Sequence, residues 1–183
     1  MNEPLARFSE RARDLKQAFD HAFAAPVLAK TDATEDLIEI GAGASSYCLR
    51  LSEITGLYND KAITPLPGSP PTLLGIAGFR GAIVPIYSLA ALLGGPGSDA
   101  SRWLALVDSP RVALAFETFE GHLCIPAQAL VRCTAGEDTH RHVRAMAHVG
   151  GSLKPVLDLP SILEAIKARA HELLSKRNIT HVQ

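Results

Sequence analysis

The span 73–94 constrains the fold more than any other part of the sequence, because two apolar runs, a tight turn and a helix start follow one another within it. The two runs predict antiparallel strands joined by a turn at Ala77–Gly81. In this turn, Gly78 and Gly81 permit a positive φ or a close backbone approach. We therefore expect a β-hairpin whose corner presents the side chain of Arg80.

A short helix is expected directly after this hairpin. The second strand, Ala82–Tyr87, is followed by Ser88, whose hydroxyl can cap a helix over Leu89–Leu93. Gly94 can then end that helix in the left-handed conformation. The span thus predicts a strand, a tight turn, a second strand and a short helix in immediate succession.

Short apolar runs separated by turn residues fill most of the remaining sequence. Runs on either side of Gly41–Gly43 predict a hairpin with one solvated face, because apolar and polar residues alternate over 47–52. Further runs predict hairpins over Trp103–Phe116 and Val143–Leu157. Together they make about ten short strands, broken midway at 94–101, and indicate an all-β fold of two small barrels.

Helical periodicity flanks this β region at both ends. Apolar residues at every third or fourth position over 2–24 predict an amphipathic helix, which either lies back on a barrel or docks onto a partner. A stripe of apolar residues from Ile162 to Leu174 predicts a second helix that begins near Pro160 and covers the core.

These features give expected boundaries for the parts of the chain. The residues 25–35 have no periodicity and read as a linker. We expect an N-terminal helix and linker over 1–35, a β domain over 36–165 with barrels at about 36–95 and 101–160, and a C-terminal helix and tail over 160–183.

Composition narrows the classes of partner. The chain has 183 residues with 18 Lys and Arg against 19 Asp and Glu, so it lacks the basic excess that nucleic acid or an anionic membrane surface requires. No apolar run approaches the roughly 20 residues that span a bilayer, and no signal peptide is visible, so we expect a cytoplasmic protein without membrane insertion. The three cysteines show no C-x-x-C spacing and are interpreted as small buried apolar residues.

Several stretches carry a resemblance to a known family. They are ITPLPGSPP and LLGIAGFRG with the branched strand and short helix that follow, YCLRLSEI over 47–54, VALAFETFEGHLCIP over 112–126, and the step LDL over 157–159. In spacing and residue type they resemble CheW-like proteins, the adaptors that couple chemoreceptors to the CheA histidine kinase in bacterial chemosensory arrays. The resemblance covers about 36–165.

The resemblance sharpens both fold and function. It implies two SH3-like five-stranded β-barrels packed on one hydrophobic core. It also implies a non-catalytic scaffold, without cofactor or metal, that lies in the cytoplasm at membrane receptor arrays. The implied partners are the regulatory domain of a CheA-type histidine kinase and the cytoplasmic tip of methyl-accepting chemoreceptors.

The same resemblance points to residues for partner contact. In the family, the arginine at Arg80 is associated with receptor and kinase coupling, and the positions of Ile54 and Leu57 belong to an apolar surface that touches the receptor. Packing inside the protein is the competing role for all three side chains. The expected partner-contact residues are Arg80, Ile54, Leu57, Phe79, Gly81 and Glu120.

The sequence departs from the family pattern at three places. Gly56 stands where a glutamate is common, Gly78-Phe79 replaces Asn-Leu, and Ser88 replaces aspartate. These departures, together with the extra N-terminal helix, suggest an alternative function as a divergent coupler of a non-flagellar chemosensory pathway.

An enzymatic or ligand-binding barrel is a further alternative from a different class. Its pocket would use Glu117, Arg111 and His122. The paired carboxylates Glu117 and Glu120 have no accompanying catalytic group, however, and the histidines at 140, 142 and 148 lack a recognisable ligand set. We therefore expect no catalytic activity.

Overall fold

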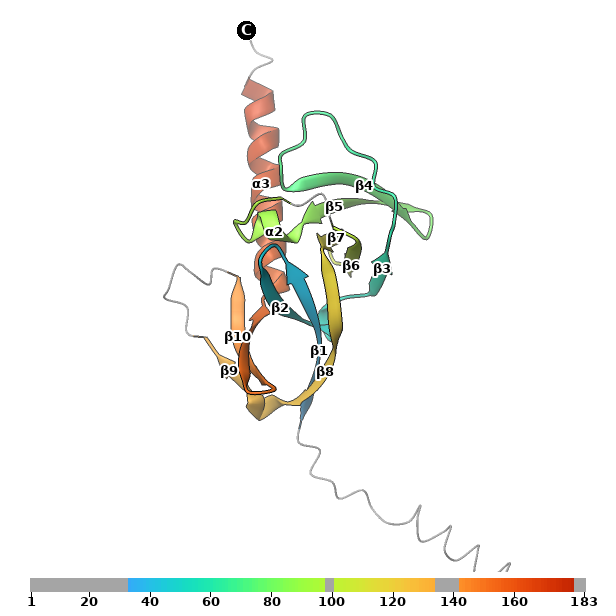
Figure 1. Cartoon of the computed structure of the whole chain (residues 1–183). Coiled ribbons are helices and arrows are strands. Elements are labelled where there is room, and N and C mark those ends of the chain that lie inside the picture. Colours follow the sequence, from blue (N-terminus) through green and yellow to red (C-terminus); the bar gives the residue numbers. More distant parts are fainter. Residues whose placement is uncertain (1–32, 98–100, 134–141, 180–183) are drawn as a thin grey trace, which may run out of the picture. The chain divides into compact units, whose positions relative to one another are not determined.

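The structure is a computed structural model that describes residues 33–97, 101–133 and 142–179 (Figure 1). Its contacts divide the chain into two units, 1–33 and 34–183. The helix expected over 2–24 lies outside the described residues. Most of the linker expected over 25–35 also lies outside the described residues, and strand β1 begins at Thr34.

The described part of the second unit is built on two β-sheets (Figure 1). The six-stranded sheet has the order β8-β1-β2-β11-β10-β9 and curves into a half-barrel. Its strands are β1 (Thr34–Ala42), β2 (Ser45–Arg50), β8 (Thr118–Pro126), β9 (Leu130–Arg132), β10 (Val143–Val149) and β11 (Ser152–Leu157).

The five-stranded sheet has the order β3-β6-β7-β5-β4. Its strands are β3 (Gly56–Asn59), β4 (Leu73–Phe79), β5 (Ala82–Ser88), β6 (Trp103–Asp108) and β7 (Arg111–Phe116). This mostly β fold of two sheets with a C-terminal helix confirms the expected fold class.

The sheets do not follow the expected break in the sequence at 94–101. Strands β1 and β2 join strands from the C-terminal half, and β3, β4 and β5 join β6 and β7. Four pairings make these connections: β2 with β11 and β5 with β7 are parallel, and β1 with β8 and β3 with β6 are antiparallel. The sequence analysis predicted hairpins of consecutive strands. It did not predict these pairings, because the paired strands lie far apart in the sequence. The expected domain boundaries stay a prediction.

A central core lies between the sheets and holds them together. It combines fully buried Leu49 and Ile40 of one sheet with Leu114 and Phe116 of the other. Truncating a fully buried Phe side chain to Ala costs about 3–5 kcal/mol in general. We therefore expect the two sheets to unfold together rather than separately.

Each sheet also has a core on its other face. Leu104 and Leu106 of β6 pack into a second core, and Cys48 of β2 packs into a third core inside the half-barrel. The hairpin of β1 and β2 was expected to have one solvated face, and this is wrong. Cys48 and Leu49 are neighbours on opposite faces of β2, and both are fully buried, because one face packs on the third core and the other on the central core.

The interior of the half-barrel also holds charge. Glu39 of β1 is buried and pairs with Lys154 of β11. Burial, with a smaller contribution from the charge of Glu120, raises the pKa of the Cys48 thiol to about 11, so this thiol stays protonated. The expectation of buried cysteines holds for Cys48 but is wrong for Cys124, which is exposed on the edge strand β8.

Helices complete the fold. Helix α2 (Leu89–Leu92) begins where expected, since the Ser88 hydroxyl accepts a hydrogen bond from Ala91 N at 3.3 Å, and Gly94 follows it with a φ of 88°. Helix α3 (Leu159–Ile179) is also confirmed. Two 3-10 turns, η1 (Leu51–Glu53) and η2 (Ala127–Ala129), join strands.

The first turns of α3 cover the central core. Ile162, Leu163 and Ile166 are buried, whereas Ala170 is exposed, so this member of the expected stripe does not cover the core. The later members of the stripe fall among residues whose side chains are not described. Within the described residues, no helix combines the length and the apolar character required to cross a membrane.

Candidate partner-contact surface

The tip of the β4–β5 hairpin is tighter than expected. Phe79 pairs with Ala82, which leaves Arg80 and Gly81 as the two central residues of the turn. Their φ angles are 46° and 81°, as a type I′ turn requires. The predicted five-residue turn over 77–81 is therefore wrong, since its first three residues belong to β4.

Arg80 lies at this tip in a conformation that favours glycine. A left-handed conformation costs an ordinary residue roughly 1–2 kcal/mol, so the fold alone gives no reason to place arginine here. Its side chain is exposed and forms no ion pair within the described residues. A guanidinium presented in this way can pair bidentately with a carboxylate.

Ile83 is a surface residue that the sequence analysis missed. It is 75% exposed and follows the tip on β5, where it pairs with Gly78. A Cβ atom at Gly78 would meet nothing within 4 Å, so the surface beside Ile83 is open. The sequence analysis treats this strand as an apolar run, but within it Val84 and Ile86 are buried and Ile83 is exposed.

Phe79 supports the tip from inside. It is 3% exposed, its ring lies 4.9 Å from that of Tyr58 in an edge-to-face arrangement, and Lys61 Nζ lies 4.9 Å above it. Because Phe79 is buried, it can affect a partner through the exposed residues next to it, which are Arg80, Gly81 and Lys61. Its expected role in partner contact stays a prediction.

Gly56 lies against the ring of Tyr58. A Cβ atom at Gly56 would lie 2.8 Å from Cε2 of Tyr58, closer than real Cβ atoms approach other atoms. The glutamate that the family pattern places here would therefore force Tyr58 to move. Because Tyr58 also contacts Phe79, two departures from the pattern meet at one side chain.

Ile54 and Leu57 are half-buried and pack against the central core. They thus contribute both to the interior and to the surface. Thr55, between them, is fixed to the five-stranded sheet, because its backbone N–H and its hydroxyl both donate to the carbonyl oxygen of Leu106, at 2.8 and 3.2 Å.

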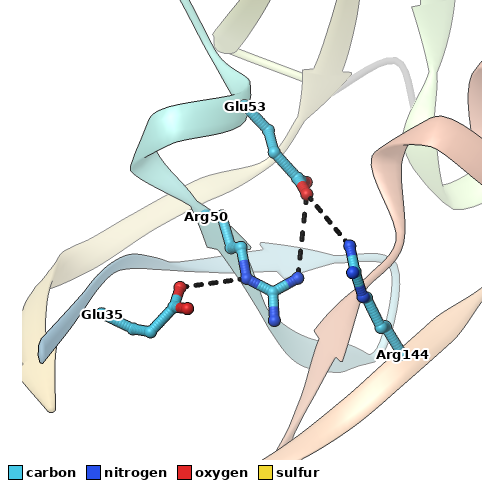
Figure 2. Close-up of polar contacts among 4 residues, drawn as sticks. All are labelled: Glu35, Arg50, Glu53 and Arg144. Atoms are coloured by element: carbon cyan, nitrogen blue, oxygen red, sulfur yellow. Dashed lines mark hydrogen bonds and ion pairs between the residues drawn. The ribbon is translucent and has the colours of Figure 1, made fainter. Parts of the chain in front are cut away.

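Glu53, the residue before Ile54, belongs to a network of four charged residues (Figure 2). Arg50 Nε donates to Glu35 Oε2 at 3.1 Å. Oε1 of Glu53 lies 3.7 Å from Nη1 of Arg50 and 3.8 Å from Nη1 of Arg144. The network therefore connects β1, β2, η1 and β10.

The environment of Glu53 is poorly solvated. Burial, the largest influence, raises the pKa of Glu53, and the charge of Asp158 acts in the same direction. The cations Arg50 and Arg144 oppose this shift without cancelling it, as does the backbone N–H of Leu159. Ionised Glu53 thus depends on its two arginines.

Glu117 and Glu120 hold the β1–β2 turn. Glu117 Oε2 accepts a hydrogen bond from Gly43 N at 3.0 Å, and Glu120 Oε1 accepts one from the hydroxyl of Ser46 at 3.1 Å. Glu120 is exposed, so a role in partner contact stays a prediction.

The pocket expected for an enzymatic barrel is not assembled from its three residues. Arg111 pairs with Asp108, His122 Nε2 lies 3.0 Å from Asp36 Oδ1, and Glu117 binds the β1–β2 turn. Among the described residues, no group of three histidine, cysteine, aspartate or glutamate side chains is arranged for a metal ion. His140 lies outside the described residues.

Comparison with known proteins identifies the family. Residues 36–167 match the CheW-like domain. The chain belongs to the CheW-like domain family. The CheW-like family is a non-catalytic scaffolding family, which agrees with the expectation of no catalytic activity.

Two curated relatives are similar to parts of this CheW-like chain. A probable chemotaxis protein CheW from Rhizobium etli is 31% identical over 77 residues, which are 42% of this chain and 50% of the relative. Chemotaxis protein CheW from Rhizobium meliloti is 30% identical over 64 residues, which are 35% of this chain and 41% of the relative. The chain therefore spans half or less of the length of these relatives.

A solved structure shares the fold. The scaffolding protein TtCheW from Thermoanaerobacter tengcongensis has a TM-score of 0.59 and 17% sequence identity, and the match covers 67% of this chain and 88% of that protein. The two proteins therefore share a fold, in agreement with the CheW-like family.

Proposed function

We propose that this CheW-like chain is a coupling scaffold that links the cytoplasmic tips of chemoreceptors to the regulatory domain of a CheA-type histidine kinase. The family, and relatives named as chemotaxis proteins, support this role. In such a complex the chain would work in the cytoplasm, beside the membrane that carries the receptors.

The observation that carries the proposal is the surface at the β4–β5 tip. Arg80 and Ile83 are exposed within three residues of each other, and Lys61 adds a second positive charge near Phe79. A partner segment that presents a carboxylate beside an apolar side chain would bind both groups. Ile54 and Leu57 would form the apolar contact with the receptor.

The test is calorimetric titration of the kinase regulatory domain and, separately, of a receptor tip fragment into the full chain. We expect Arg80→Ala and Ile83→Asn to weaken binding of at least one of these two partners, with little change in thermal stability because both side chains are exposed. Arg169→Ala removes an exposed arginine of α3 and is the matched control.

Two results would contradict the proposal. One is that neither the kinase domain nor the receptor tip binds the unmodified chain. The other is that the Arg80 and Ile83 variants bind normally but unfold at much lower temperature, because these side chains would then serve the fold rather than a partner.

A second candidate function, coupling in a divergent non-flagellar chemosensory pathway, rests on the contact of Gly56 and Phe79 with Tyr58. This arrangement excludes a glutamate at position 56 unless Tyr58 moves, so it favours a receptor that differs from those of the usual family pattern. Affinity purification from the native cell, with mass spectrometry of the partners, decides between the two. Recovery of the kinase that controls the flagellar motor would rule the second candidate out.

A further inference from the structure

The side chain of Glu53 is turned into the protein at the residue before Ile54. It is only 18% exposed, and it lies beside Arg50 on one side and Arg144 on the other (Figure 2). Arg144 belongs to β10, and β11 lies between β10 and β2 in the sheet. Glu53 therefore fixes the turn η1 to a strand that is not its neighbour.

Ile54 is held between two anchors that belong to different sheets. Glu53 ties the preceding residue to the six-stranded sheet, through Arg50 and Arg144. Thr55 ties the following residue to Leu106 of the five-stranded sheet. The position of the Ile54 side chain thus depends on both anchors.

The two arginines contribute differently to the Glu53 anchor. Arg50 is 13% exposed and is also bound by Glu35, so its removal would leave a buried carboxylate and disturb the fold. Arg144 is 49% exposed, and its ion pair within the described part of the chain is with Glu53. Removing Arg144 therefore weakens the Glu53 anchor without opening the interior of the protein to solvent.

We propose that Arg144 is a positioning residue for the partner surface at Ile54, and that it acts through the Glu53 carboxylate. The inference rests on the proposed function, since it gives Ile54 a partner to contact. It adds a residue that neither the motif spans nor the apolar pattern singled out, because the chain separates Arg144 from Ile54 by ninety positions and only the fold brings them together.

The charges around the anchor support this role. Arg50, Arg144 and Asp158 all influence the pKa of Glu53, and Glu35 faces Arg50 from the other side. Without Arg144, one of the two cations that favour the ionised carboxylate is lost. Of these two cations, Arg50 would then remain beside Glu53, together with the backbone N–H of Leu159, and η1 would lose its ion pair with β10.

The first experiment measures the backbone amide NMR signals of the free full-length chain. The variants are Arg144→Gln, which removes the charge, Arg144→Lys, which keeps it, and Arg132→Gln, which removes an exposed arginine of the neighbouring strand β9 as the matched control. We expect Arg144→Gln to shift the signals of residues 51–57, Arg144→Lys to shift them less, and Arg132→Gln to leave them unchanged.

A double-mutant comparison separates action through Glu53 from a general effect. Glu53→Gln alone should move the same signals, and Glu53→Gln combined with Arg144→Gln should add little to either change. Shifts of the two variants that simply add would overturn the proposal, and so would an unchanged spectrum in Arg144→Gln.

The second experiment titrates a receptor tip fragment into the same variants. We expect Arg144→Gln to weaken binding by up to about fivefold, because an exposed ion pair supplies no more than that, and Arg144→Lys to recover part of it. Normal binding by Arg144→Gln would overturn the inference. If the unmodified chain fails to bind while the NMR shifts occur, the proposed function fails and the positioning of Ile54 by Arg144 stands.

Discussion

At the scale of single residues, the informative positions are those where the residue type does not suit the backbone conformation or the burial of its site. Arg80 adopts a left-handed φ of 46° that glycine would adopt at lower cost, and Ile83 leaves an apolar side chain 75% exposed. Glu53 places a carboxylate where burial raises its pKa. Arg80 and Ile83 bring the fold no visible benefit, Glu53 holds η1 against the six-stranded sheet, and all three lie at or beside the proposed partner surface.

Glu53 gives a pH-dependent prediction. Because its pKa is raised in the folded state, the folded protein binds the Glu53 proton more tightly than the unfolded chain does. Its contribution to stability is therefore most favourable below the unfolded-state pKa and falls as pH rises through the folded-state pKa. Glu53→Gln has no such dependence, so its unfolding free energy relative to the unmodified chain should increase as pH rises through that window.

Urea unfolding of both proteins across a series of pH values from acidic to neutral measures this difference. The fall in stability with rising pH should be larger in Arg144→Gln than in the unmodified chain, because one of the two cations that oppose the rise in the pKa of Glu53 is gone. A relative stability of Glu53→Gln that fell with rising pH would show that the two arginines outweigh burial.

Gly56 gives a steric prediction. The new methyl group of Gly56→Ala would lie 2.8 Å from the ring of Tyr58, so this ring, which contacts Phe79 edge-to-face, must shift. We expect a loss of about 1–3 kcal/mol in unfolding free energy, the usual cost of overpacking. In a Tyr58→Ala background the same substitution should cost much less, and equal costs in both backgrounds would contradict the steric explanation.

At the scale of elements, the sequence predicted local units well and their partners poorly. The hairpin of β4 and β5 with the helix after it was predicted because glycine, serine and apolar runs act over a few residues. The turn at its tip was predicted too long, since a type I′ turn needs only Arg80 and Gly81. The solvated face expected for β2 was wrong because burial of Cys48 depends on strands far away in the sequence.

Helix α2 gives the prediction at this scale. The Ser88 hydroxyl is fully buried and accepts the Ala91 N–H, so Ser88→Ala removes the cap and leaves that donor without its partner. We expect a loss of about 1 kcal/mol in unfolding free energy, measured by thermal or urea unfolding. Ser152→Ala, at the exposed start of β11, is the control and should change little. Equal stability of the two variants would show that the cap contributes nothing.

At the scale of the whole molecule, the fold class and the family could be predicted, but the arrangement of the strands could not. Parallel pairing of β2 with β11 and of β5 with β7 exchanges strands between the two halves of the chain. The same exchange brings Arg144 beside Glu53, which explains why sequence reasoning found Arg80 but missed Arg144. Ile83 was missed for a related reason, since its exposure depends on pairing with Gly78.

The most direct test of the central claim is the activity of the kinase in a reconstituted mixture. Purified CheA-type kinase, receptor fragments in membrane vesicles and the full chain are combined, and the rate of kinase autophosphorylation is measured with and without the chain. Coupling predicts that the unmodified chain raises the rate only when receptor is present, that Arg80→Ala largely abolishes the rise, and that Arg169→Ala leaves it intact. A rate that the chain does not alter, or one that Arg80→Ala supports in full, would contradict the account.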